Sequence, residues 1–185
     1  MTKSLISKYH GGMTAHTEYL SDVFVKENFS ETMRRTTHLA RMMRRAYKFD
    51  TIVFTGMSGA AVAFPLSLAL NTSLVCIRKV NDNSHYPFSF EGNANVKDYI
   101  IVDDFISIGT TIRNVLSKMA KAKPKATCKA ILLYKSRRHK LFSYKGNAIN
   151  VHCSDQFWME QDSTPCELLR FQRKNPPTLS DRYYS

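Results

Sequence analysis

The stretch that most constrains this chain is YIIVDDFISIGTT, at residues 99–111. A run of strand-forming apolar residues ends in Asp103 and Asp104, and a turn of small residues then leads into a helical pattern. Continuous apolar character is typical of a strand buried on both faces, as in a parallel sheet. Because ligands of open α/β sheets bind beyond the carboxyl ends of such strands, we expect a binding site at these carboxylates. The predicted fold is α/β, with a mostly parallel central sheet flanked by helices.

The turn after the two aspartates has the composition of an anion-binding segment. Backbone N–H groups, hydroxyls and a helix N-terminus together suit a phosphate. The residues predicted to hold the phosphate are Ser107, Ile108, Gly109, Thr110 and Thr111.

The rest of the chain alternates between strand and helix patterns. Ser30 is predicted to cap the helix expected at 31–47. Pro65 is predicted to kink the helix expected at 60–70 or to delay its start. The polar segment 80–97 is long enough to be a functional loop. Strands are predicted at 50–54, 74–77, 99–102, 127–134 and 148–153, and helices at 14–28, 31–47, 60–70 and 110–122. Residues 1–185 are expected to form one domain, with its core at about 50–153, N-terminal helices at 14–48 and a small C-terminal hood or tail at 154–185.

Composition narrows the partners without choosing one. The 185 residues carry a formal charge of +12, which favours phosphorylated metabolites or nucleic acid as partners, or is a solvated basic surface. The apolar runs are too short to span a bilayer, and the N-terminus lacks the apolar core of a signal peptide. A cytoplasmic location without membrane attachment is expected. There is no Cys-x-x-Cys pair and the histidines are scattered, so no zinc site is predicted.

Three other classes of α/β site are excluded by missing motifs. A Walker B strand also ends in acidic residues, but the chain has no Gly-x4-Gly-Lys-Ser/Thr. It has no Gly-x-Gly-x-x-Gly for a dinucleotide either. A response-regulator receiver domain has its acidic pair near the first strand, whereas here about a hundred residues precede the pair.

VDDFISIGTT at 102–111 resembles the signature of the type I phosphoribosyltransferases, which bind phosphoribosyl pyrophosphate (PRPP). The order of other segments adds to the resemblance over roughly residues 50–135. TGMSG at 55–59 is similar to the family's pyrophosphate loop, and Arg78-Lys79 to the basic pair that follows it. Ser84-His85 with Glu91-Gly92 resembles the mobile catalytic loop.

The resemblance implies a role for each matching residue. Asp103 and Asp104 would accept hydrogen bonds from the ribose hydroxyls of PRPP and lie near its Mg²⁺. His85 would donate to pyrophosphate, or is a solvated loop histidine. Residues 107–111 would hold the 5′-phosphate. The pyrophosphate would be held by Thr55, Gly56, Met57, Ser58, Gly59, Arg78 and Lys79.

The implied activity is Mg²⁺-dependent transfer of the 5-phosphoribosyl group from PRPP to a free nucleobase, as in nucleotide salvage, by a homodimer. The alternative is a PRPP-binding regulator that binds nucleic acid through its basic surface.

The acceptor base stays open, although a purine is favoured. Ser107 stands where the hypoxanthine/guanine branch has an acidic residue, so the adenine or orotate type fits better. The segment 80–96 has no lysine, unlike orotate enzymes. Phe157 or Trp158 would stack on the base or serve as a buried anchor.

Overall fold

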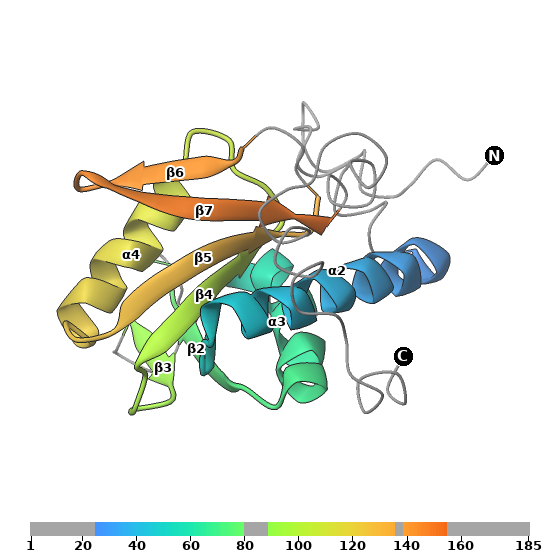
Figure 1. Ribbon diagram of the computed structural model, residues 1–185, viewed down its shortest axis with the longest axis horizontal. Helices are drawn as coiled ribbons and strands as arrows, with labels where there is room; N and C mark the ends of the chain where they lie inside the picture. Colours follow the sequence, from blue (N-terminus) through green and yellow to red (C-terminus); the bar gives the residue numbers. More distant parts are fainter. Residues whose placement is uncertain (1–24, 80–88, 136–138, 155–185) are drawn as a thin grey trace, which may run out of the picture.

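The computed structural model describes residues 25–79, 89–135 and 139–154 of the chain (Figure 1). Several sequence predictions lie outside these residues. They are the helix at 14–28 apart from its last residues, Ser84 and His85, the aromatic pair Phe157 and Trp158, and nearly all of the hood at 154–185.

A seven-stranded sheet in the order β3-β2-β1-β4-β5-β7-β6 forms the centre of the protein (Figure 1). Strands β2, β1, β4, β5 and β7 run parallel, while β3 and β6 pair antiparallel at the two edges. The predicted α/β fold with a mostly parallel sheet is therefore confirmed. The strand bounds are β1 Thr51–Phe54, β2 Ser73–Ile77, β3 Phe90–Gly92, β4 Asp98–Asp103, β5 Thr127–Leu133, β6 Leu141–Tyr144 and β7 Asn147–Cys153.

Helices cover both faces of the sheet, which explains why its central strands are apolar throughout. Helices α2 (Lys26–Tyr47) and α3 (Gly56–Leu70) pack on the face that carries Ile100 and Val102, and α4 (Thr110–Ala122) packs on the face that carries Ile101. Alternate residues of one strand thus enter opposite cores. Because β4 is the central strand, its carboxyl end lies midway along the side of the sheet where the parallel strands end.

Helix α2 begins earlier than predicted, so Ser30 is not its N-cap. Ser30 lies inside the helix, where its hydroxyl donates to the carbonyl of Lys26 at 2.9 Å. The preceding residues have no proline or glycine to stop the helix. The residues that α2 buries are Thr32, Thr36, Leu39, Ala40, Met42 and Met43.

Helix α3 also begins earlier than expected, at Gly56 instead of residue 60. It continues through Pro65, so the delayed start predicted from that proline is wrong. A proline inside a helix costs about 3 kcal/mol through a lost hydrogen bond and a clash. Burial of Val62, Leu66 and Leu70 against the sheet offsets this cost. The early start turns most of the predicted pyrophosphate loop into the first turn of a helix.

The two edge strands were missed or misplaced by the sequence patterns. Residues 90–92 belong to the polar segment 80–97, in which the alternation at 86–91 suggests a short hairpin, and they form β3 beside β2. Gly92, with φ of 125°, allows this pairing because a Cβ there would lie 2.2 Å from the carbonyl oxygen of Leu74. Strand β6 was not predicted at all. It forms a tight hairpin with β7 in which Lys145 and Gly146 both have positive φ.

Among the described helices, none combines the length and the apolar character needed to cross a bilayer. Of the chain's described cysteines, Cys76 and Cys128 are half-buried and Cys153 is buried.

Candidate functional site

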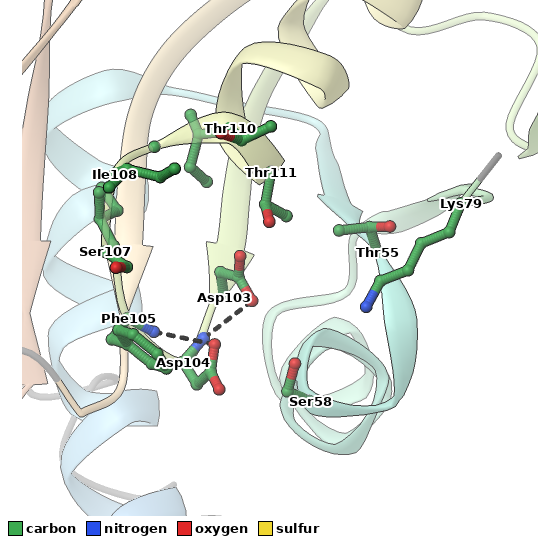
Figure 2. Close-up of a pocket in the computed structure, with 13 residues that line it drawn as sticks. Thr55, Ser58, Lys79, Asp103, Asp104, Phe105, Ser107, Ile108, Thr110 and Thr111 are labelled. Carbon is green, nitrogen blue, oxygen red and sulfur yellow. Dashed lines mark hydrogen bonds between the residues drawn. The ribbon is translucent and has the colours of Figure 1, made fainter. Parts of the chain in front are cut away.

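The acidic pair closes the carboxyl end of β4 and is nearly inaccessible. Asp103 is 4% exposed and Asp104 is 3% exposed. The backbone N–H of Asp104 donates to Asp103 Oδ1 at 3.0 Å, and the N–H of Phe105 donates to Asp104 Oδ1 at 2.9 Å. Each carboxylate is thus held by the backbone that follows it. Both residues line the cavity at the end of β4, and Figure 2 shows their carboxylates pointing in different directions, with that of Asp103 on the side of Thr111.

Asp103 is held in an environment that disfavours its charge. Burial raises the pKa of the Asp103 carboxyl well above its usual range, and the neighbouring Asp104 carboxylate raises it further. The Lys79 ammonium acts in the opposite direction and lowers this pKa. A carboxyl whose pKa is shifted by burial and by a neighbouring charge, and which lines a cavity, is a candidate functional group.

The turn from Ser107 to Thr111 forms the second wall of the site. Gly109 has φ of 81° and is the N-cap residue of α4, so the helix begins with its N–H groups at the turn. The side chains of Ser107, Ile108, Thr110 and Thr111 are all exposed. A helix N-terminus with adjacent hydroxyls is a site for an anion.

Helix α3 and the end of β2 form the third wall. Thr55, the N-cap residue of α3, and Ser58, in its first turn, line the cavity together with Lys79. Gly56 has φ of 64°, and a Cβ there would lie 3.1 Å from Lys79 Cε and 3.2 Å from its Nζ. The absence of a side chain at Gly56 therefore lets the lysine cross the helix terminus and approach the aspartates.

These three walls enclose one cavity of about 200 Å³. Figure 2 shows the Asp103 carboxylate, the Thr111 hydroxyl and the Lys79 ammonium directed toward a shared space. A cavity of this composition can bind a molecule with an anionic group at one end, hydroxyls in the middle and a second anionic group near Lys79. Its lining is Thr55, Ser58, Lys79 and residues 103–112.

Arg78 lies apart from the acidic pair. Its Nε donates to Glu91 Oε1 at 2.5 Å, and its carbonyl accepts a hydrogen bond from Lys118 Nζ at 2.5 Å. It lines a neighbouring cavity of about 380 Å³ between the end of β2 and α4. The two cavities share Thr55, Lys79, Thr110 and Thr111.

Two residues of the TGMSG segment do not serve the cavity. Met57 points to solvent and is 75% exposed. Gly59 faces the sheet, where a Cβ would lie 3.1 Å from Phe54 Cβ and 3.2 Å from the carbonyl oxygen of Val102. Gly59 therefore allows close packing of α3 on the strands, and it is not among the residues that line the cavity.

Tyr134 connects two walls of the site, the end of β4 and the first turn of α3, and was not singled out from the sequence. Its backbone N–H donates to the carbonyl of Asp103 at 3.2 Å, and its hydroxyl donates to the carbonyl of Ser58 at 3.0 Å. Burial and the two aspartates raise the pKa of this phenol, so the hydroxyl stays protonated and can donate. The available signal was its place at the end of a strand next to β4.

Three apolar residues that line the cavity were also missed: Phe105, Ile106 and Ile112. Phe105 follows the acidic pair directly, which was the signal that could have found it.

Comparison with solved structures shows the same fold in known enzymes. An adenine phosphoribosyltransferase is 19% identical, with 74% of this chain and 85% of that chain covered and a TM-score of 0.53. The orotate phosphoribosyltransferase from Aeropyrum pernix is 14% identical, with 77% of each chain covered and a TM-score of 0.53. That from Francisella tularensis is 15% identical, with 82% of this chain and 81% of that chain covered and a TM-score of 0.50.

No protein-family model and no curated protein matches the sequence. The fold of this chain is thus the fold seen in these phosphoribosyltransferases.

Proposed function

We propose that the protein is a phosphoribosyltransferase that transfers the 5-phosphoribosyl group from PRPP to the nitrogen of a free base and releases pyrophosphate. The observation that carries the proposal is the single cavity that joins the acidic pair, the turn 107–111 and Lys79. Its order of groups matches the order of groups along PRPP. The enzymes with the same fold are adenine and orotate phosphoribosyltransferases, which supports the same reaction class.

In this proposal the 5′-phosphate binds at the N-terminus of α4, where N–H groups and the hydroxyls of Thr110 and Thr111 meet it. The carboxylates of Asp103 and Asp104 accept hydrogen bonds from the ribose hydroxyls. Positive charge develops at the ribose C1 as its bond to pyrophosphate breaks, and the acidic pair stabilises it. Thr55, Ser58 and Lys79 bind the departing pyrophosphate, which is electrostatic stabilisation of a leaving group.

The residues present fit a magnesium ion only in company with the substrate. Among residues 25–79, 89–135 and 139–154, no three His, Cys, Asp or Glu side chains come together. Mg²⁺ commonly binds through one or two carboxylates plus substrate phosphates and waters. Asp103 and Asp104 are suited to that role beside a bound pyrophosphate. The ion would supply neutralisation of the charge that builds on the leaving group.

For the acceptor, we propose a purine of the adenine type in preference to hypoxanthine or guanine. Ser107 is exposed at the cavity, where it presents a hydroxyl and no carboxylate. A hydroxyl is a weaker acceptor than a carboxylate for a ring N–H. The Ser107 hydroxyl does not distinguish adenine from orotate, and an activity assay with each base does.

The experiment is incubation with PRPP, Mg²⁺ and, in turn, adenine, hypoxanthine, guanine, orotate or uracil, while pyrophosphate is measured. We expect pyrophosphate release only with one base or a narrow group of bases, and none without a base. Absence of product with every base, together with tight and salt-sensitive nucleic-acid binding, would contradict the enzyme assignment and favour a regulator.

Lys79→Gln is expected to weaken pyrophosphate binding by about 10-fold, because one charge-assisted contact is lost. The side chain is exposed, so the fold should be unchanged. Calorimetric titration with pyrophosphate and Mg²⁺ gives the Kd. Lys121→Gln is the matched control, since Lys121 is an exposed lysine in the last turn of α4. Equal Kd values for wild type and Lys79→Gln would show that Lys79 does not contribute to pyrophosphate binding.

A further inference from the structure

The turn that lines the phosphate end of the cavity rests on two side chains outside the cavity lining. One is Arg113, four residues into α4, and the other is Phe142, on the edge strand β6. Arg113 Nη1 donates to the carbonyl oxygen of Ile108 at 2.6 Å. Its guanidinium carbon lies 5.2 Å from the centre of the Phe142 ring, in cation–π contact.

Gly109 is packed directly against both groups. A Cβ at this position would lie 2.7 Å from Phe142 Cε2 and 2.9 Å from Arg113 Nη1. The backbone of the turn therefore touches the guanidinium and the ring with no space between them. Phe142 is only 5% exposed and belongs to the core between the sheet and α4, so it is a fixed surface for the turn.

The hydrogen bond to Ile108 has a consequence for the next peptide group. In a trans peptide the C=O of one residue and the N–H of the next point in opposite directions. The peptide bonds of the described residues, including this one, are trans. When Arg113 holds the Ile108 carbonyl, it therefore turns the Gly109 N–H to the opposite side.

We propose that Arg113 and Phe142 are positioning residues that hold the turn 107–111 in the conformation that binds a phosphomonoester. The proposal rests on the proposed function. It gives β6, a strand whose sequence does not suggest a site, a role in supporting the turn through Phe142. Arg113 acts through the Ile108 carbonyl and Phe142 acts through Arg113 and Gly109. The ligand class is the 5′-phosphate of a ribose phosphate, and the pyrophosphate end of the cavity lies outside their influence.

The test compares two probes on the full chain by calorimetric titration: ribose 5-phosphate, and pyrophosphate with Mg²⁺. We expect Arg113→Ala to weaken ribose 5-phosphate binding by about 10-fold, the effect of losing one hydrogen bond from a charged group. Pyrophosphate binding should stay within about 2-fold of wild type. Lys121→Ala removes the same charge from the far end of α4 and should change neither affinity.

Phe142→Leu distinguishes positioning from direct contact, because it removes the cation–π partner without changing charge. We expect it to weaken ribose 5-phosphate binding selectively. The loss of binding free energy in the Arg113→Ala/Phe142→Leu double variant should be no larger than the sum of the two single losses. If Arg113→Ala weakens binding while Phe142→Leu does not, Arg113 contacts the phosphate itself and the positioning role is overturned. Wild-type affinity in both variants would overturn it as well.

A readout without ligand separates this inference from the proposed function. Amide hydrogen exchange of residues 107–111 should be faster in Arg113→Ala than in wild type, because the turn is released. If wild type binds no ribose 5-phosphate but exchange still accelerates, the proposed function fails and the role of Arg113 in the turn stands. Unchanged exchange overturns the inference. Arg113 is exposed, so this variant keeps the test valid even if Phe142→Leu lowers the melting temperature.

Discussion

Asp103→Asn is expected to raise the melting temperature at neutral pH while it lowers kcat/KM by on the order of 100-fold. The amide keeps the shape of the carboxylate, and its oxygen can still accept the Asp104 N–H, which lies 3.0 Å from Asp103 Oδ1. It removes the charge that burial and Asp104 disfavour. Opposite effects on stability and catalysis are the sign of a residue that serves a site at a cost to the fold.

The stability gain should depend on pH in a defined direction. The pKa of Asp103 is raised in the folded state, so its unfavourable contribution is absent below the unfolded pKa of about 4. Stability is lost as the pH rises through the folded pKa, because the unfolded state releases the proton more readily. The melting-temperature difference between Asp103→Asn and wild type should therefore grow from pH 4 to pH 8. Each kcal/mol corresponds to about 2–4 °C for a chain of this size.

Asp98→Asn is the matched control for this charge change. Asp98 lies at the opposite end of the same strand, partly exposed, and is paired with Lys129 at 3.0 Å. An exposed pair contributes about 0–1 kcal/mol, so this variant should melt near wild type and keep full activity. If Asp103→Asn instead lowered the melting temperature at neutral pH and kept the turnover of Asp98→Asn, the acidic pair would be structural.

Gly109→Ala should reduce ribose 5-phosphate binding by at least about 10-fold, measured by calorimetric titration. A non-glycine residue in the left-handed region costs about 1–2 kcal/mol, and Gly109 has φ of 81°. The added methyl would also overlap the Phe142 ring, since its carbon would lie 2.7 Å from Cε2. The turn must then move, which displaces the N–H groups at the start of α4.

Gly146→Ala separates the backbone cost from the loss of the binding turn. Gly146 has φ of 80°, nearly the same as Gly109, but a Cβ there would meet nothing within 4 Å. It lies in the turn between β6 and β7. The variant should lose a similar amount of stability through φ alone and bind ribose 5-phosphate normally. If both variants bound the ligand equally well, the phosphate would not be held at residues 107–111.

The sequence alone was sufficient for the fold class and for most of the candidate site. Apolar runs ending in Asp103-Asp104 and in Thr55 mark buried parallel strands, because only strands covered on both faces are apolar throughout. The carboxyl end of β4 and the turn 107–111 were predicted as a site from this pattern. The resemblance to the type I phosphoribosyltransferases added Thr55 and Lys79. The cavity brings these residues together. The assignment of their ligands remains a prediction.

Tertiary packing decided what local pattern could not. Helix α3 begins at Gly56 because its burial against the sheet outweighs Pro65, and Gly59 serves that packing. Arg78 turns to Glu91 because β3 pairs with β2, and this strand pairing was not predicted from the sequence. Tyr134 contacts the Ser58 carbonyl, 76 residues away in the chain, and Phe142 on β6 contacts Arg113 on α4. Such contacts depend on which strands become neighbours, and this is a property of the assembled sheet that periodicity does not encode.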